Sequence, residues 1–138
     1  MPTTDTSDTS APVPAITVGV VALDTDEPRR LADFYAALLG WEVTRSADDW
    51  VEIHPSTGSG DGATGLAFQL VIDYVPPTWP TQDVPQQIHL DLDVADLDAG
   101  EQFALSVGAR RVKGPKSSTS FRVFLDPSGH PFCLCQAG

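Results

Sequence analysis

His89 and Cys133 carry the side chains of this chain that are best suited to chemistry, an imidazole and a thiol. His89 stands in the segment His-Leu-Asp-Leu-Asp-Val, where apolar and polar residues alternate as they do along a half-buried strand. It therefore shares a strand face with Asp91 and Asp93. An imidazole on that face could act as a general base or hydrogen-bond a substrate. It could equally be a structural histidine whose partner is a neighbouring carboxylate such as Asp91.

The chain has two cysteines, Cys133 and Cys135, which stand two residues apart on a predicted strand. Their side chains point to the same side, where they are poorly placed to bond to each other. Reduced thiols favour a cytoplasmic protein. Cys133 could be a nucleophile or a soft metal ligand, and the simpler interpretation is a small buried residue. The alternation of the strands places both thiols on the side of His89.

Aromatic and amide side chains could complete a binding site around these residues. Trp50 and Trp79 could stack against a planar ligand, and Trp79 lies in a proline-rich segment that could form a lid. Glu52 and His54 share a strand face with Trp50 and could form an acid–base pair, although surface positions are the simpler interpretation. With His89 as the candidate catalytic residue, the predicted substrate-binding set is Gln69, His89, Cys133, Trp50 and Trp79.

The elements that must position these side chains occur twice, as one strand, one helix and three strands in each half. Leu23 and Phe34 recur 69 residues later as Leu92 and Phe103, and a glycine closes each predicted helix. Pairing of the halves would bury the apolar face that each sheet exposes alone. We expect a disordered leader over residues 1–15 and one domain over 16–136, with a first module at 16–72, a connector at 73–86 and a second module at 87–136.

Hydrophobic spacing predicts the bounds and faces of individual elements. The first strand of each half is expected to begin at Ile16 and Gln87, and a polar turn is expected over residues 46–48. Each helix should bury one apolar face, formed by Leu31, Phe34, Tyr35, Leu38 and Leu39 in the first helix and by Leu97, Phe103, Ala104 and Val107 in the second.

The charge balance of the chain argues against two classes of partner. With 19 acidic and 8 basic residues, the net charge is -11, which repels nucleic acid and anionic membrane surfaces. No apolar stretch approaches the ~20 residues that a membrane span needs. The N-terminus also lacks a charged-then-apolar leader. The basic residues around Arg110 to Lys116 could guide an anionic substrate, although solvated surface is the simpler interpretation.

Three segments carry a family resemblance, residues 33–41 (DFYAALLGW), 89–94 (HLDLDV) and 126–130 (DPSGH). With them, residues 16–136 resemble the vicinal oxygen chelate superfamily, the group of glyoxalases, bleomycin-resistance proteins and extradiol dioxygenases. The resemblance implies an α+β fold, in which two βαβββ modules pair into a curled, half-open, barrel-like sheet with the helices outside. It also implies a homodimer with its cups near the subunit interface. His130 replaces the family's usual asparagine and is expected to be only a turn residue.

Metal-dependent members of this superfamily hold a divalent ion with one ligand on each of the first, fourth, fifth and last strands. The resemblance places these four positions at Val20, Gln69, His89 and Cys133. Valine offers no lone pair and an amide oxygen is a weak ligand, so the set falls below the three protein ligands of catalytic zinc sites. It also lacks the carboxylates that magnesium or manganese prefers. We therefore expect no usual metal and no cofactor, with a divalent ion as the alternative.

These observations favour a protein that binds a small organic molecule without a metal. The alternative is a lyase, isomerase or dioxygenase-type enzyme with an unusual metal set or with His89 in acid–base chemistry. A third hypothesis is an interaction protein with no ligand.

Overall fold

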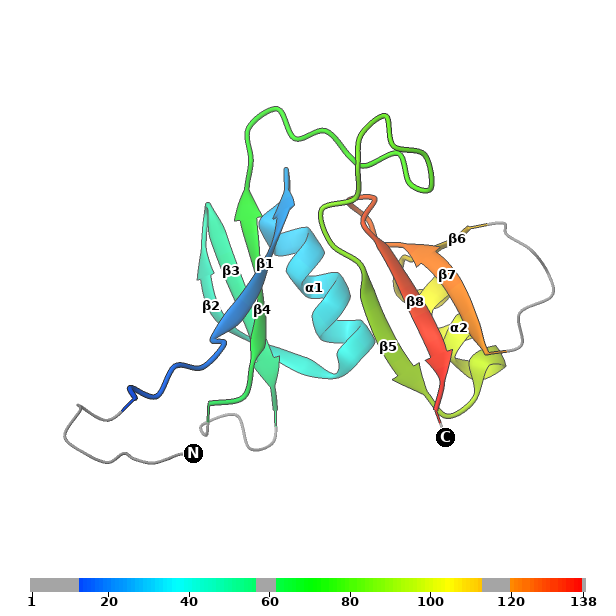
Figure 1. The fold of residues 1–138 in the computed structure, drawn as a ribbon, viewed down its shortest axis with the longest axis horizontal. Coiled ribbons are helices and arrows are strands. Elements are labelled where there is room, and N and C mark those ends of the chain that lie inside the picture. The colour runs from blue at the N-terminus through cyan, green and yellow to red at the C-terminus, as the bar shows by residue number, and fades with distance from the viewer. Residues whose placement is uncertain (1–12, 57–61, 113–119, 138) are drawn as a thin grey trace, which may run out of the picture.

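The first module has the predicted order of one strand, one helix and three strands (Figure 1). The structure is a computed structural model, which describes residues 13–56, 62–112 and 120–137. Its sheet has the order β1-β4-β3-β2, with β1 parallel to β4 and the other pairs antiparallel. The elements are β1 (Val20–Thr25), α1 (Pro28–Leu39), β2 (Trp41–Ala47), β3 (Trp50–Pro55) and β4 (Gly65–Leu70).

The second module repeats this topology in a separate sheet of order β5-β8-β7-β6. Again the first strand pairs in parallel with the last, and the remaining pairs are antiparallel. The predicted α+β fold of two equivalent modules is therefore confirmed. The elements are β5 (Leu90–Val94), α2 (Leu97–Val107), β6 (Arg110–Arg111), β7 (Phe121–Leu125) and β8 (Pro131–Gln136).

Local sequence fixes the ends of both helices. Pro28 occupies the first turn of α1, where its missing N–H has no intrahelical partner to lose. Gly40 ends α1 at a φ of 71°, in the left-handed region that glycine adopts without a Cβ clash. The Asp96 side chain caps α2 by accepting hydrogen bonds from the N–H groups of Asp98 and Ala99.

Helix α1 lies between the two sheets and joins them into one core (Figure 1). The Tyr35 ring stacks on Phe68 of β4 with centroids 5.7 Å apart, and Phe34 approaches Phe132 of β8 at 6.0 Å. Phe132 in turn stacks on Phe124 of β7 at 5.5 Å. The sheets thus turn one face each toward a shared apolar centre.

Three predicted bounds are wrong at strand ends. β1 begins at Val20 rather than Ile16, because its parallel partner β4 begins at Gly65, opposite Val20. β5 begins at Leu90 rather than Gln87, because β8 begins at Pro131, which has no N–H to extend the ladder. The β2–β3 turn covers residues 48–49, not 46–48, since Ala47 pairs with Trp50.

The predicted burial of Phe103 is also wrong, because 48% of this residue is exposed whereas Phe34 is 4% exposed. A Cβ added at Gly100 would lie 2.9 Å from the Val94 side chain, so α2 approaches β5 closely through Gly100. That contact turns the helix face bearing Leu97 and Ala104 into the core and leaves Phe103 outside.

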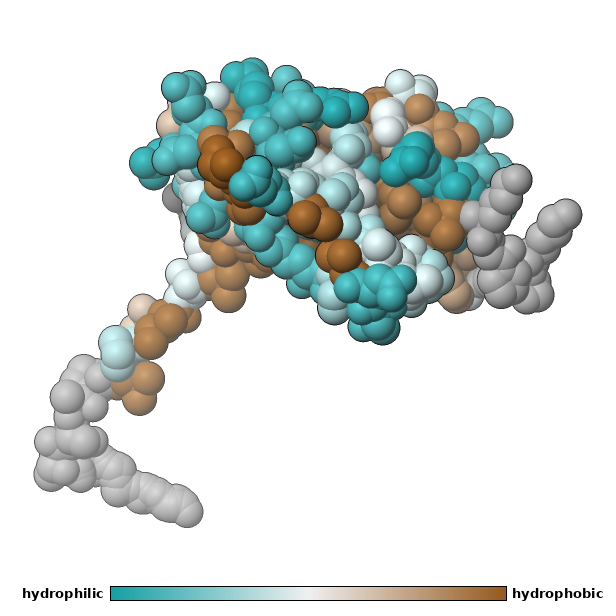
Figure 2. All heavy atoms as spheres, turned by 90° about the horizontal axis from the view of Figure 1, so that it is seen from above, coloured by the Kyte–Doolittle hydropathy of each residue, from teal (hydrophilic) through white to brown (hydrophobic). Residues whose placement is uncertain are grey.

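Of the predicted leader, residues 1–12 lie outside the described residues. Residues 13–19 have no regular structure and extend away from the body of the molecule (Figure 2). Most of these residues are apolar, and Val13 and Ile16 are 90% and 86% exposed.

Candidate functional site

Each sheet has an outer face, defined here as the face opposite the shared core. In the second sheet, Phe132 and Leu134 point into the core, so the alternate residues of β8 and its partner β5 lie on the outer face. In the first sheet, Phe68 and Ile53 point into the core in the same way. The outer faces carry four of the predicted site residues, His89 and Cys133 in the second sheet and Trp50 and Gln69 in the first. Their neighbours on these faces are Asp91 and Cys135 in the second sheet and Glu52 and His54 in the first.

The structure brings His89, Cys133 and Asp91 together on the second sheet. The His89 Nε2 atom lies 3.1 Å from Cys133 Sγ and 3.1 Å from Asp91 Oδ1. The strand register causes this, because Asp91 stands directly opposite Cys133 and His89 precedes Asp91 by two residues. Cys133 is buried at the base of the cluster, and the Asp91 side chain is exposed at its rim.

Burial, as the largest cause, together with the nearby Asp91 carboxylate and Cys135, raises the pKa of the Cys133 thiol to about 11. Asp91 also accepts a hydrogen bond from the thiol, which stabilises the protonated form. The pKa of Cys135 is raised as well, mainly by burial and then by Asp91 and Asp93. Both thiols are therefore protonated at neutral pH, unlike the low-pKa thiolates of catalytic cysteines.

The connector brings Trp79 to the same cluster. The Trp79 ring meets the His89 ring edge-on, with centroids 6.2 Å apart. Trp79 lies in a short loop closed by hydrogen bonds from Thr78 N to Val84 O (2.9 Å) and from Val84 N to Thr78 Oγ1 (2.8 Å). A half-buried indole thus stands beside the imidazole, where a flat ligand could contact both.

The outer face of the first sheet is organised differently. Trp50 Nε1 donates a 2.6 Å hydrogen bond to Glu52 Oε2, and His54 Nδ1 lies 2.6 Å from Thr44 Oγ1. Glu52 and His54 are therefore each engaged with another partner, and they do not form the acid–base pair considered from the sequence. Gln69 is exposed on this face.

The four positions of the usual metal centre do not supply a four-ligand set here. Val20 has no donor atom. Gln69 stands opposite Asp24, near the other end of β1 from Val20. In the first module, the pair equivalent to Asp91 and Cys133 is Ala22 and Ala67, which offers no ligand either. A four-ligand site repeated across both modules is therefore not built by these residues.

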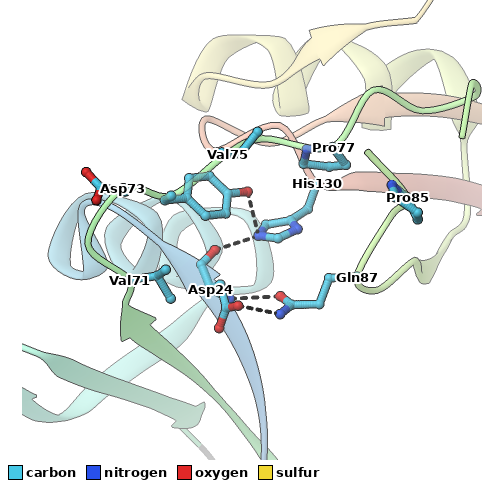
Figure 3. A pocket seen from close by; sticks show the side chains of 9 residues that line it. Asp24, Val71, Asp73, Val75, Pro77, Pro85, Gln87 and His130 are labelled. Carbon is cyan, nitrogen blue, oxygen red and sulfur yellow. Dashed lines mark hydrogen bonds between the residues drawn. The ribbon is translucent and has the colours of Figure 1, made fainter. Parts of the chain in front are cut away.

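A second polar site, which the sequence did not reveal, joins the two modules (Figure 3). Gln87 receives a hydrogen bond from Asp24 N (2.9 Å) and donates one to Asp24 Oδ2 (2.6 Å). His130 Nε2 donates to the Asp24 carbonyl oxygen at 2.7 Å and lies 3.2 Å from the Tyr74 hydroxyl. These residues border a cavity of about 180 Å³ between β1 and the connector.

The expectation that His130 is only a turn residue is therefore wrong. It is 1% exposed, and its buried Nδ1 atom has no hydrogen-bond partner among the described residues. The same turn carries Asp126, whose Oδ2 accepts a 2.7 Å hydrogen bond from Tyr35 of α1. Burial raises the pKa of Asp126, and the Tyr35 hydrogen bond opposes that shift. Burial and the Asp126 charge also raise the pKa of Tyr35.

Neither α1 nor α2, the helices of the described residues, is long and apolar enough to cross a membrane.

Comparison with known proteins identifies a family and several solved structures that are similar to this chain. The sequence profile of the glyoxalase-like domain matches residues 20–135. No curated protein matches the chain. Among solved structures, a glyoxalase/bleomycin resistance protein/dioxygenase family enzyme from Burkholderia phytofirmans PsJN aligns with a TM-score of 0.65 at 18% identity, over 88% of this chain and 98% of that one.

Two further structures share the fold at similarly low identity. TnmS3, an antibiotic-binding protein from Streptomyces sp. CB03234, aligns with a TM-score of 0.59 at 20% identity, over 91% of this chain and 99% of that one. A glyoxalase-related enzyme from Fulvimarina pelagi aligns with a TM-score of 0.61 at 16% identity, over 88% of each chain. Since the profile spans both modules, the chain belongs to the glyoxalase-like domain family of the vicinal oxygen chelate superfamily.

Proposed function

We propose that this chain binds a small organic molecule on the outer face of its sheets, beside His89 and Trp79, without the usual four-ligand metal centre. The observation that carries the proposal is the edge contact between the Trp79 and His89 rings above the buried Cys133 thiol. An aromatic wall beside a small number of hydrogen-bonding groups is the usual composition of a small-molecule site. The antibiotic-binding TnmS3, which shares the fold, is consistent with it.

Charge and shape narrow the ligand class. The net charge of -11 and the exposed Asp91 carboxylate disfavour anions. Indole and imidazole rings favour a flat aromatic partner, because ring pairs add about 0.5–1.5 kcal/mol beyond the area they bury. We therefore propose a planar, neutral or cationic aromatic compound, with Trp50 and Gln69 of the other sheet as further binding residues.

Tryptophan fluorescence quenching on chelator-treated protein tests the proposal, with a neutral flavone, a cationic acridine and a bleomycin as probes. Saturable quenching by one of them is expected, together with at least threefold weaker binding in Trp79→Ala. Trp41→Phe is the matched control, because the partly buried Trp41 packs against the core. The absence of saturable binding by all three probes, or equal affinity of Trp79→Ala and wild type, would count against the proposal.

A second candidate function is an enzyme, either a lyase or isomerase in which His89 is the acid–base group, or a dioxygenase-type enzyme that would also need an unusual metal set to activate O2. It is favoured by the 3.1 Å contact with Asp91, since a carboxylate can orient an imidazole and stabilise its protonated form. Turnover assays with the hemithioacetal of methylglyoxal and glutathione, and with catechol, test it. Activity that His89→Gln abolishes while the fold is retained would support catalysis, and activity that survives this change would exclude His89 as the base.

We further propose a cytoplasmic homodimer. The free thiols of Cys133 and Cys135 fit a reducing compartment. Exposed apolar side chains at two places, Val13 and Ile16 in the N-terminal segment and Phe103 on α2, provide surface that a second copy could cover. Sedimentation equilibrium should give twice the 14.7 kDa mass of one chain, and a single-chain mass at micromolar concentration would refute the dimer.

A further inference from the structure

The cluster of His89, Asp91 and Cys133 has the donor composition of a zinc site. The three ligand atoms, an imidazole nitrogen, a carboxylate oxygen and a thiol sulfur, all lie within 4.8 Å of one another. A tetrahedral zinc ion, with Zn–N of about 2.0 Å and Zn–S of about 2.3 Å, separates nitrogen and sulfur by roughly 3.5 Å. The observed separation between His89 Nε2 and Cys133 Sγ is 3.1 Å, so the two side chains need to move apart by only a few tenths of an ångström to admit the ion.

We propose that these three side chains bind a zinc-type divalent ion within the second module alone. The site differs from the usual centre of the fold, because Asp91 replaces any ligand from the first module. The inference goes beyond the proposed binding function and does not depend on it. Thiolate and imidazole ligands select zinc over magnesium or calcium, which prefer sites built from oxygen atoms.

Hydrogen bonds already hold the three polar groups of this cluster together. His89 Nε2 lies 3.1 Å from both Cys133 Sγ and Asp91 Oδ1, and the Cys133 thiol donates to Asp91. An ion at the centre would engage all three groups at once. On binding, the Cys133 thiol would release its proton to solvent, since the thiolate is the ligand form.

The place of the three ligands on the sheet would leave the ion accessible to solvent. Cys133 forms the buried base, whereas the side chains of His89 and Asp91 are 30% and 69% exposed. Three protein ligands leave the fourth tetrahedral position open, as in catalytic zinc sites. With Cys133 as the base of the site, that position would face the exposed side of the sheet, where Trp79 contacts His89. A water molecule or an oxygen or nitrogen donor of a bound compound could occupy it.

Cobalt(II) titration of the chelator-treated full chain tests the site, because a cobalt–thiolate bond gives a charge-transfer absorption that zinc then abolishes by displacement. One equivalent of cobalt is expected to produce the band. Cys133→Ser should lose the band. Asp91→Asn should weaken cobalt binding at least about tenfold, because losing even a residue that only hydrogen-bonds to a metal ligand lowers metal affinity by about that factor or more.

Neighbouring residues provide matched controls. Cys135→Ser removes the other free thiol of β8, and Asp93→Asn removes the next carboxylate of β5, without touching the cluster. Both variants should keep the band and the affinity of the wild type. The proposal is overturned if wild type shows no thiolate band, if Cys133→Ser retains it, or if Cys135→Ser or Asp93→Asn removes it. Ligand binding is measured on metal-free protein, so either proposal can fail alone.

Discussion

The hydrogen bond between Tyr35 and Asp126 should stabilise the junction between the modules, and Tyr35→Phe removes it alone. The hydroxyl of Tyr35 donates at 2.7 Å to Asp126 Oδ2, and both residues are fully buried. Phenylalanine keeps the ring that stacks on Phe68 and meets Phe34 edge-on, so no cavity larger than one oxygen atom results. The loss of stability therefore reports the hydroxyl.

The expected loss is about 2 kcal/mol in the free energy of unfolding, because a hydrogen bond to a charged group contributes about 1.5–3 kcal/mol. For a chain of this length that corresponds to a fall in Tm of roughly 6–10 °C. Asp126 keeps its Oδ1 hydrogen bonds from the N–H groups of Ser128 and His130, which should hold the turn in place.

The loss should also depend on pH. The folded-state pKa of Asp126 is raised above its ordinary value of 3.8, so this carboxyl contributes stability at low pH that is lost as pH rises through the folded pKa. Removing the Tyr35 hydrogen bond raises that pKa further. The deficit of Tyr35→Phe should therefore be larger at neutral pH than near pH 4.

Urea denaturation at both pH values measures the effect, with Tyr74→Phe as control. Tyr74 donates to the neutral Ser128 carbonyl oxygen at 2.8 Å from a half-buried position, so its loss should be about 0.5–1.5 kcal/mol. A Tyr35→Phe deficit below that of Tyr74→Phe, or one that grows as pH falls, would refute the reasoning.

Three further predictions concern packing and capping, each measured by urea denaturation. Gly65→Ala should cost about 1–3 kcal/mol, because a Cβ there would lie 2.5 Å from a backbone oxygen of β3, whereas Gly19→Ala, with nothing within 4 Å, should be nearly neutral. Phe34→Ala should cost about 3–5 kcal/mol and the half-exposed Phe103→Ala under about 1 kcal/mol, and comparable losses would contradict the observed rotation of α2. Asp96→Ala should cost about 1 kcal/mol through its two cap hydrogen bonds, and an unchanged stability would show that the cap is dispensable.

The order of elements could be predicted because the sequence repeats it, and residues that cap or end helices mark the element boundaries. Gly40 and Gly108 both end helices at positive φ, and Asp96 caps α2 as its position before the apolar run indicates. Alternation along the strands was enough to place His89 and Cys133 on one face, where their side chains meet at 3.1 Å. These features are local, and local patterns are what a single sequence expresses most directly.

Features that depend on packing between distant segments could not be predicted. The repeat made Phe34 and Phe103 equivalent, yet α1 is covered by both sheets and α2 approaches its own sheet through Gly100. The role of His130 depends on Asp24, which is 106 residues away and in the other module. Asp91 was one of the partners considered for His89, but its place opposite Cys133 follows from a strand register that spacing alone does not give.

Indole N–H signals in a two-dimensional NMR titration test the central claim of ligand binding on the outer faces most directly. The chain has three tryptophans, and their indole signals distinguish the binding residues Trp50 and Trp79 from Trp41, which packs against the core. With a planar aromatic probe added to metal-free protein, the Trp79 and Trp50 signals should shift in a saturable way while the Trp41 signal stays in place. A saturable shift of Trp41 alone, or no shift of Trp79 at saturation, would contradict the proposed site.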